Sequence, residues 1–154
     1  MKMKQGILTQ ITSINGALRR TSVLYSEWSR KHDINHFAMK ILYVLVTEGP
    51  ATQKKISEEN KLSKQTVNTI VTALKENEYV VLVNCAGDKR EKTVELTEKG
   101  LDYATKLLDP LFQIEERIIK KMGNQNVRQL IELMTIYSDI MEKEMQNKEA
   151  AEND

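Results

Sequence analysis

One expected helix carries a face of short, uncharged side chains that are rich in hydrogen-bonding groups. Gln65, Thr69 and Thr72 lie opposite the apolar stripe through Val67 when the segment is placed on a wheel of about 100° per residue. Amide side chains can pair with adenine through two hydrogen bonds, and hydroxyl groups can contact base edges or phosphates. Exposed helix faces more often carry Glu and Lys, so this face favours contact with nucleic acid over the alternative of an ordinary solvated face.

The surrounding segment suits approach to a phosphate backbone. Residues 63–75 include Lys64 and Lys75 but no acidic side chain, so nothing in the segment repels a polyanion. The formal net charge of the whole chain is only +1. This global value neither supports nor excludes DNA binding, because the position of the charges decides.

A second charged group lies in a polar segment between two β-prone runs. Arg90 at the tip of a hairpin could enter the DNA minor groove, where the negative potential favours a guanidinium. Asp88, two residues earlier, could pair with Arg90 and hold its planar side chain. Lys89 and Lys92 could add phosphate contacts. Taken alone, the same residues would describe a charged hairpin turn.

A helix-turn-helix is expected to position the first group. A short helix over about 52–60 begins at Thr52, and residues 60–62 form a tight corner. Ser63 then caps a helix that runs to about Asn77. Two short helices joined by about three residues are the outline of a helix-turn-helix. The inward stripe of the second helix contains Val67, Ile70, Val71 and Leu74.

A hairpin is expected to carry the second group. Residues 79–83 are β-branched and aromatic and predict a strand, 86–92 form a polar tip, and 93–96 predict the return strand. Thr97 caps the helix that follows. A hairpin placed after a helix-turn-helix is a wing.

Long helices are expected to flank this unit. The first 30 residues carry an apolar seam that another helix must cover, from this chain or another copy. Asn35 caps a second helix, which Gly49-Pro50 ends at about Glu48. Pro110 is expected to kink the helix after the wing or to divide it, and Gly123 to end it before a last helix over about 124–146. The seam consists of Ile7, Ile11, Ile14, Leu18, Tyr25 and Trp28.

The region from residue 62 to residue 100 resembles the winged helix domain of the MarR family of bacterial transcription regulators. The resemblance extends over nearly all of the chain, because the family also has a long first helix and two last helices in a dimerisation lobe. The motifs that carry it are Leu62-Ser63, Asp88-x-Arg90 and Leu96-Thr97-x-x-Gly100.

The resemblance implies roles for particular residues and partners. It implies that Arg90 contacts the minor groove, that Asp88 positions Arg90, and that residues 63–69 face the major groove. It also implies a two-fold dimer on a pseudo-palindromic operator and, in many relatives, a small-molecule ligand between the lobes. The physical argument agrees, since pairing two copies would bury the seams and place two reading helices about 34 Å apart.

We therefore expect a mostly α fold with a small β-hairpin wing, that is, a winged helix-turn-helix domain plus a helical dimerisation lobe. Residues 35–109 form the DNA-binding domain, residues 1–34 and 110–146 the dimerisation helices, and residues 147–154 a flexible tail. The expected DNA contacts are Ser63, Lys64, Gln65, Thr66, Asn68 and Thr69 on the helix and Asp88, Lys89, Arg90 and Lys92 on the wing.

Several other side chains are of types that can bind a ligand or a metal or react with an oxidant. Trp28, His36, Tyr43 and Tyr103 are candidates for a ligand pocket, although aromatic residues at helical spacing more often belong to the core. His32 and His36 are four residues apart, but Asn35 caps the helix between them, so no metal site is expected. Cys85 is interpreted as a small hydrophobic residue on a wing strand rather than a redox sensor.

The predicted function is that of a sequence-specific double-stranded DNA-binding regulator, a repressor released by a small apolar or phenolic effector. The alternative is a winged helix protein-interaction module that does not contact DNA. An enzyme is disfavoured because there is no Gly-rich phosphate loop, Cys/His metal spacing or nucleophile elbow, and no cofactor is expected. A single cysteine, with neither a signal peptide nor a long apolar run, predicts a cytoplasmic protein without membrane contact.

Overall fold

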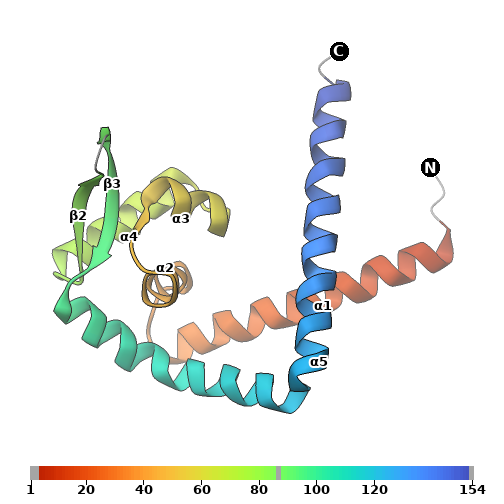
Figure 1. The fold of residues 1–154 in the computed structure, drawn as a ribbon, viewed down its shortest axis with the longest axis horizontal. Coiled ribbons are helices and arrows are strands. Elements are labelled where there is room, and N and C mark those ends of the chain that lie inside the picture. The colour runs from red at the N-terminus through yellow and green to blue at the C-terminus, as the bar shows by residue number, and fades with distance from the viewer. Residues whose placement is uncertain (1–3, 86–87, 153–154) are drawn as a thin grey trace. The chain divides into compact units, whose positions relative to one another are not determined.

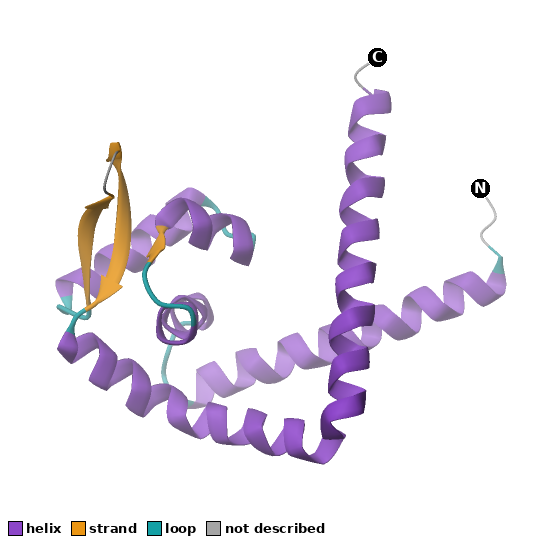
Figure 2. Ribbon diagram, in the orientation of Figure 1, coloured by secondary structure: helices purple, strands orange, loops and turns teal. Residues whose placement is uncertain are grey.

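The computed structural model describes the backbone of residues 4–85 and 88–152, and the side chains of residues 4–84 and 92–147. The chain consists of two compact units, Met1–Leu108 and Asp109–Asp154. The elements are α1 (Gln5–Lys31), α2 (His36–Thr47), β1 (Ala51–Thr52), α3 (Gln53–Asn60), α4 (Lys64–Glu76), β2 (Val80–Cys85), β3 (Asp88–Leu96) and α5 (Glu98–Glu152) (Figures 1 and 2). The fold is mostly helical with a small antiparallel sheet, as the sequence predicts.

Side-chain caps begin helices α2, α3 and α4, at the residues that the sequence indicates. The side chain of Asn35 accepts hydrogen bonds from the backbone N–H groups of Phe37 and Ala38. Thr52 accepts one from Lys55 at the start of α3, and Ser63 accepts one from Thr66 at the start of α4. Each cap satisfies a backbone donor that the helix leaves without an internal partner, which contributes about 1 kcal/mol.

The sheet has three strands in the order β1-β3-β2, all antiparallel. The predicted hairpin of β2 and β3 is present and is longer than expected, because the polar residues of its tip join the ladder through backbone groups. Strand β1 was not predicted. It has only two residues, Ala51 opposite Val94 and Thr52 opposite Thr93, and two residues are too few to show a period.

The core of the first unit joins its helices to this sheet. Val94 of β3 is fully buried, and the other buried apolar residues come from the helices and strands of the same unit. Figure 1 shows the β2–β3 hairpin beside α4. The most deeply buried apolar residues are Met39, Ile41, Leu42, Ile56, Val67, Val71, Val80, Val94, Ala104 and Leu108.

Helix α5 passes through Pro110 and is interrupted instead at Gly123. The backbone at Gly123 has φ 74° and ψ 152°, which lies outside the helical region, so the predicted stop at this residue is confirmed. Pro110 lies inside the helix and does not end it. Helical backbone continues to Glu152, and fraying of the 147–154 tail stays a prediction.

Apolar side chains remain exposed along both long helical segments. The seam of α1 leaves Ile7, Ile11, Ile14 and Leu18 between 39% and 48% exposed. In the second unit, Leu130, Ile131, Leu133 and Ile136 are between 46% and 64% exposed. No helix of the described residues is long and apolar enough to cross a membrane.

Candidate DNA-binding site

Helix α4 presents the predicted polar face to solvent. Val67, Val71 and Leu74 are buried and anchor one side of the helix in the core. Gln65 and Thr69, on the other side, are exposed, as are Asn68 and Thr72. The buried stripe therefore fixes which way the polar face points.

Two of the predicted contact residues also hold the start of the helix together. Ser63 Oγ accepts a hydrogen bond from the Thr66 backbone N–H at 3.0 Å. The hydroxyl groups of the same two residues are 2.8 Å apart and share a further hydrogen bond. Ser63 Oγ therefore caps α4, as the sequence indicated, and the Thr66 hydroxyl bonds to the capping hydroxyl.

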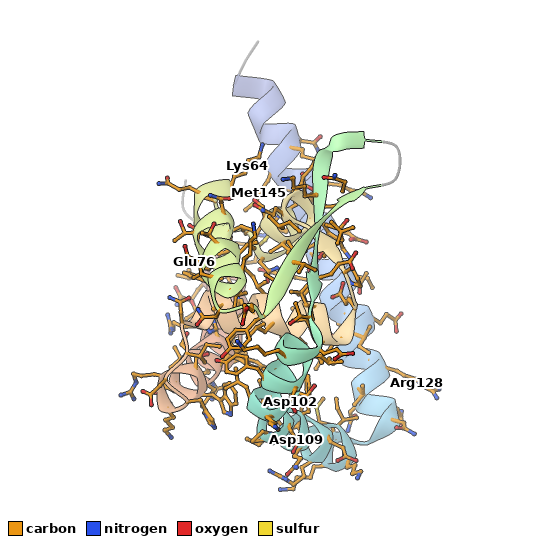
Figure 3. All side chains as sticks on the ribbon, turned by 90° about the vertical axis from the view of Figure 1, so that its left-hand side faces the viewer. Lys64, Glu76, Asp102, Asp109, Arg128 and Met145 are labelled. Atoms are coloured by element: carbon orange, nitrogen blue, oxygen red, sulfur yellow. The ribbon has the colours of Figure 1, made fainter. Side chains whose placement is uncertain are left out.

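The cations of this helix lie at its two ends. Figure 3 labels Lys64 near the start of α4 and Glu76 near its end. Lys64 and Lys75 are exposed. The N-terminal end of a helix also carries a partial positive charge from its free N–H groups, so Lys64 adds to a field that attracts phosphate.

The wing places the second predicted group on β3. The backbone of Asp88, Lys89 and Arg90 belongs to this strand, but their side chains lie outside the described residues, as does the Cys85 side chain. Lys92 is exposed and lies opposite Asn84 in the strand register. The proposed pairing of Asp88 with Arg90 therefore stays a prediction.

The wing is joined to α5 by a junction around Thr97. The Thr97 N–H donates to the Tyr79 carbonyl at 3.1 Å, and its Oγ1 donates to the Glu78 carbonyl at 2.7 Å. The same Oγ1 accepts the Gly100 N–H at 2.9 Å, so the predicted cap is confirmed. Thr97 thereby ties the end of α4, the start of β2 and the start of α5 to one another.

Only glycine fits at position 100, because the Tyr79 backbone lies too close for a side chain. A Cβ atom at Gly100 would lie 1.8 Å from the Tyr79 carbonyl oxygen and 2.6 Å from its carbon. The sequence singled out Gly100 as part of a motif but did not identify Tyr79 as its neighbour. Residues about 20 apart meet here, and no local signal reports such a contact.

An ion pair and two stacked rings border the junction. Lys99 Nζ lies 2.9 Å from Glu78 Oε2, and its hydrogen bond and positive charge lower the pKa of the Glu78 carboxyl. The Tyr79 and Tyr103 rings stack with centroids 4.2 Å apart. Burial and the neighbouring Tyr79 raise the pKa of Tyr103 above the ordinary value of a tyrosine.

Tyr103 lines a shallow cavity of about 410 Å³ in the first unit. Thr69 of the exposed α4 face also lines it. The cavity is mostly apolar with a few polar groups at its edge. Its lining residues are Ile34, Asn35, Ala38, Thr69, Ile70, Ala73, Leu74, Asn77, Tyr79 and Tyr103.

The other three predicted pocket residues do not line this cavity. The Trp28 ring stacks on His32 at 4.0 Å, and only 9% of Trp28 is exposed. His36 Nδ1 lies 3.3 Å from Ser29 Oγ, which itself donates to the Tyr25 carbonyl. Tyr43 lies half-buried on α2.

The two histidines contact different partners. His32 ends α1 and its Nδ1 is 2.8 Å from the Trp28 carbonyl oxygen, whereas His36 begins α2 and faces Ser29. Burial and the nearby Lys40 charge lower the pKa of His36. Among the described residues, no group of three or more His, Cys, Asp and Glu side chains could hold a metal ion.

A polar reading helix, a preceding α3 and a hairpin wing define a winged helix-turn-helix protein of the DNA-binding class. Residues 32–91 match the model of the MarR family. Over this stretch, which is less than half of the chain, the sequence is similar to the MarR family of transcription regulators. Members of this family bind DNA as dimers.

Curated relatives agree with this assignment. The chain is 28% identical over 120 residues to an uncharacterised HTH-type transcriptional regulator of Staphylococcus aureus strain Mu50, covering 76% of this chain and 82% of the relative. It is 24% identical over 128 residues to the HTH-type transcriptional repressor NicR of Pseudomonas putida, covering 83% of this chain and 79% of the relative. These relatives are regulators and not enzymes.

Solved structures share the fold. The MarR family regulator NMB1585 of Neisseria meningitidis matches with a TM-score of 0.80 and 25% identity, over 90% of this chain and 98% of that one. Overoxidised AbfR bound to DNA matches with a TM-score of 0.64 and 18% identity, over 90% of this chain and 99% of that one.

Proposed function

We propose that the protein is a homodimeric repressor that binds a pseudo-palindromic operator and is released by a small apolar or phenolic effector. The observation that carries the proposal is the exposed polar face over residues 65–72 of α4, which includes no acidic side chain and which the buried Val67 and Val71 hold in place next to the wing. A polar helix held rigidly beside a hairpin is suited to the major groove, with the wing along the adjacent backbone.

The proposed contacts are divided between two grooves. Gln65, Asn68 and Thr69 of α4 face the major groove, and Lys64 contacts phosphate beside the capped helix start formed by Ser63 and Thr66. On the wing, Arg90 enters the minor groove with Asp88 positioning it. Lys89 and Lys92 contact the flanking phosphates.

The exposed apolar seams support the dimer. Residues 35–109 form the DNA-binding domain, and residues 1–34 and 110–146 the dimerisation helices. Apolar side chains that are about 40–60% exposed in one chain are removed from water when a second copy covers them, which stabilises the dimer. A two-fold dimer also presents its two α4 helices to successive major grooves, about 34 Å apart.

A regulator that acts on chromosomal DNA of a bacterium works in the cytoplasm.

The DNA-binding function is tested by gel-shift titration of the purified dimer on its own upstream region. We expect a specific shift that weakens steeply as salt rises, because phosphate contacts release counterions. Arg90→Ala is expected to weaken binding about tenfold or more. Lys106→Ala is the charge-matched control, since Lys106 is exposed on α5 and pairs with Asp102, and it should bind like the native protein.

The protein-interaction alternative predicts the opposite results. It predicts no shift on the upstream region, and no difference between Arg90→Ala and Lys106→Ala. A shift that is insensitive to salt would also contradict the proposed phosphate contacts.

The Tyr103 cavity supports an effector site. Its mostly apolar lining with edge hydroxyl and amide groups suits a small aromatic molecule with one polar substituent. Structures of the same fold have been solved for Staphylococcus aureus MarR with salicylate and kanamycin, and for NadR with 4-hydroxyphenylacetate. Since Thr69 lines the cavity and also lies on the exposed face of α4, a ligand here would disturb DNA contact directly.

The effector site is tested by filling the cavity. Salicylate and 4-hydroxyphenylacetate are titrated into the preformed DNA complex. Ala73→Phe places a ring into the cavity from α4 and is expected to raise the concentration needed for release at least tenfold, with DNA affinity kept. Thr105→Phe, on the exposed side of α5, is the control and should release like the native protein. Equal release of all three proteins would exclude this cavity.

A further inference from the structure

We propose that α4 reads A·T base pairs in each operator half-site, through two amide side chains and one methyl group. Gln65 and Asn68 each pair with an adenine, and the Thr69 methyl contacts the 5-methyl group of a thymine. The inference rests on the proposed DNA-binding function and assigns the base chemistry that this function requires.

The hydrogen bonds within α4 narrow the set of reading groups. Ser63 and Thr66 share a hydroxyl–hydroxyl bond of 2.8 Å and cap the helix, and Thr66 is half-buried. One of the two hydroxyl hydrogens is therefore used inside the protein, which leaves a single hydroxyl donor at the helix start. The exposed amides of Gln65 and Asn68 remain as two-point hydrogen-bonding groups on the helix surface.

The hydrogen bond of the Thr69 hydroxyl leaves the Thr69 methyl group available to contact DNA. Its Oγ1 donates to the Gln65 backbone carbonyl at 2.9 Å, as threonines in helices commonly do. The hydroxyl hydrogen is therefore used inside the helix, and the hydroxyl turns toward the backbone. The branched γ-methyl is the other substituent of the same carbon, and it is left for the groove, where the thymine methyl is its natural apolar partner.

These three residues lie on one face. Positions 65, 68 and 69 are separated by three and four residues and span about 100° of the helix wheel. They also fall in the first two turns, which is the part of a reading helix that reaches base edges. One face at one end of the helix can therefore contact neighbouring base pairs in the same groove.

The helix lacks the side chain that most often reads guanine. No arginine occurs between Lys64 and Glu76, and bidentate arginine is the commonest specific contact to guanine. Lys64 lies about 90° from the centre of the reading face, which directs it toward phosphate. The groups on α4 that remain to read bases are therefore the two amides, which can each form two hydrogen bonds with adenine.

The first experiment is selection of bound DNA from a random-sequence pool with the native dimer. The expected result is enrichment of A·T pairs at the half-site positions where 7-deazapurine substitution, which removes the major-groove N7 acceptor of either purine, weakens binding. Enrichment of G·C pairs at those positions would overturn the inference while leaving the DNA-binding function intact. No enrichment at all would overturn both.

The second experiment tests the contact between the Thr69 methyl group and a thymine methyl group by removing one thymine methyl at a time. Deoxyuridine replaces each thymine of the selected half-site in turn, which removes only the 5-methyl group. One replacement is expected to weaken native binding about fourfold, the effect of one buried methyl-sized group. Thr69→Ser, which keeps the hydroxyl but lacks the methyl, should no longer distinguish thymine from uracil at that position. Thr69→Val, which keeps the methyl, should still distinguish them.

The amide contacts are tested with 7-deazaadenine, which lacks the N7 acceptor. Native binding is expected to fall about tenfold at two adenine positions. Gln65→Ala should become insensitive at one of them and Asn68→Ala at the other. All variants change exposed side chains, and unchanged melting temperatures verify that they fold. If Thr69→Ser keeps the thymine preference, or if both alanine variants keep native sensitivity to 7-deazaadenine, the assignment is wrong.

Discussion

Gly100→Ala is expected to destabilise the protein by about 3 kcal/mol or more. The added Cβ would lie 1.8 Å from the Tyr79 carbonyl oxygen. The added Cβ is bonded directly to the backbone, and the Tyr79 oxygen is part of the backbone. No side-chain rotation can therefore relieve the overlap. Either α5 or the start of β2 must move, and that movement breaks the Thr97 bonds to Glu78, Tyr79 and Gly100.

The expected effect is large compared with total stability. Domains are stable by only about 5–15 kcal/mol, so a loss of this size is a substantial part of the whole. For a chain of this length it corresponds to a fall in melting temperature of about 10 °C. Because the wing is attached through the same junction, DNA affinity should also fall at temperatures where the variant remains folded.

Thermal and urea unfolding measure the change. Gly16→Ala is the matched control, since Gly16 lies within α1 and an added Cβ there meets nothing within 4 Å. This control should be unchanged or slightly stabilised, because alanine favours the helix by about 1 kcal/mol. A Gly100→Ala protein that melts within about 2 °C of the native one would show that the junction can adjust without cost.

The double variant Ile11→Glu with Leu18→Glu is expected to be monomeric and to lose more than 100-fold in operator affinity. Both side chains lie on the α1 seam and are 39% exposed in the single chain. Covering the seam with a second copy would bury carboxylates without partners, at a cost of several kcal/mol each. A monomer contacts one half-site only and loses half of the phosphate and base contacts.

Sedimentation at micromolar concentration measures the oligomeric state, and a gel shift measures affinity. The native protein should sediment at twice the 17.7 kDa of one chain. Thr9→Glu with Ser13→Glu is the control, because both residues are exposed on the other side of α1 and add the same charge. Dimeric behaviour of the seam variant, or dissociation of the control, would contradict the assignment of the seam.

Features that depend on neighbouring residues could be predicted from the sequence. The caps at Asn35, Thr52 and Ser63 are local because a cap needs only a polar side chain and the N–H groups two or three residues later. The polar face of α4 follows from the same helical period as its buried stripe. The resemblance to the MarR family came from motifs of a few residues on the wing and at the start of α5.

The tertiary structure alone decided the contacts between residues far apart in the chain. Strand β1 exists because Ala51 and Thr52 meet β3, more than 40 residues later. Gly100 is needed because Tyr79 lies against it, and Tyr79 stacks on Tyr103 for the same reason. Residue type and periodicity describe what one segment favours, whereas these contacts depend on which segments the core brings together.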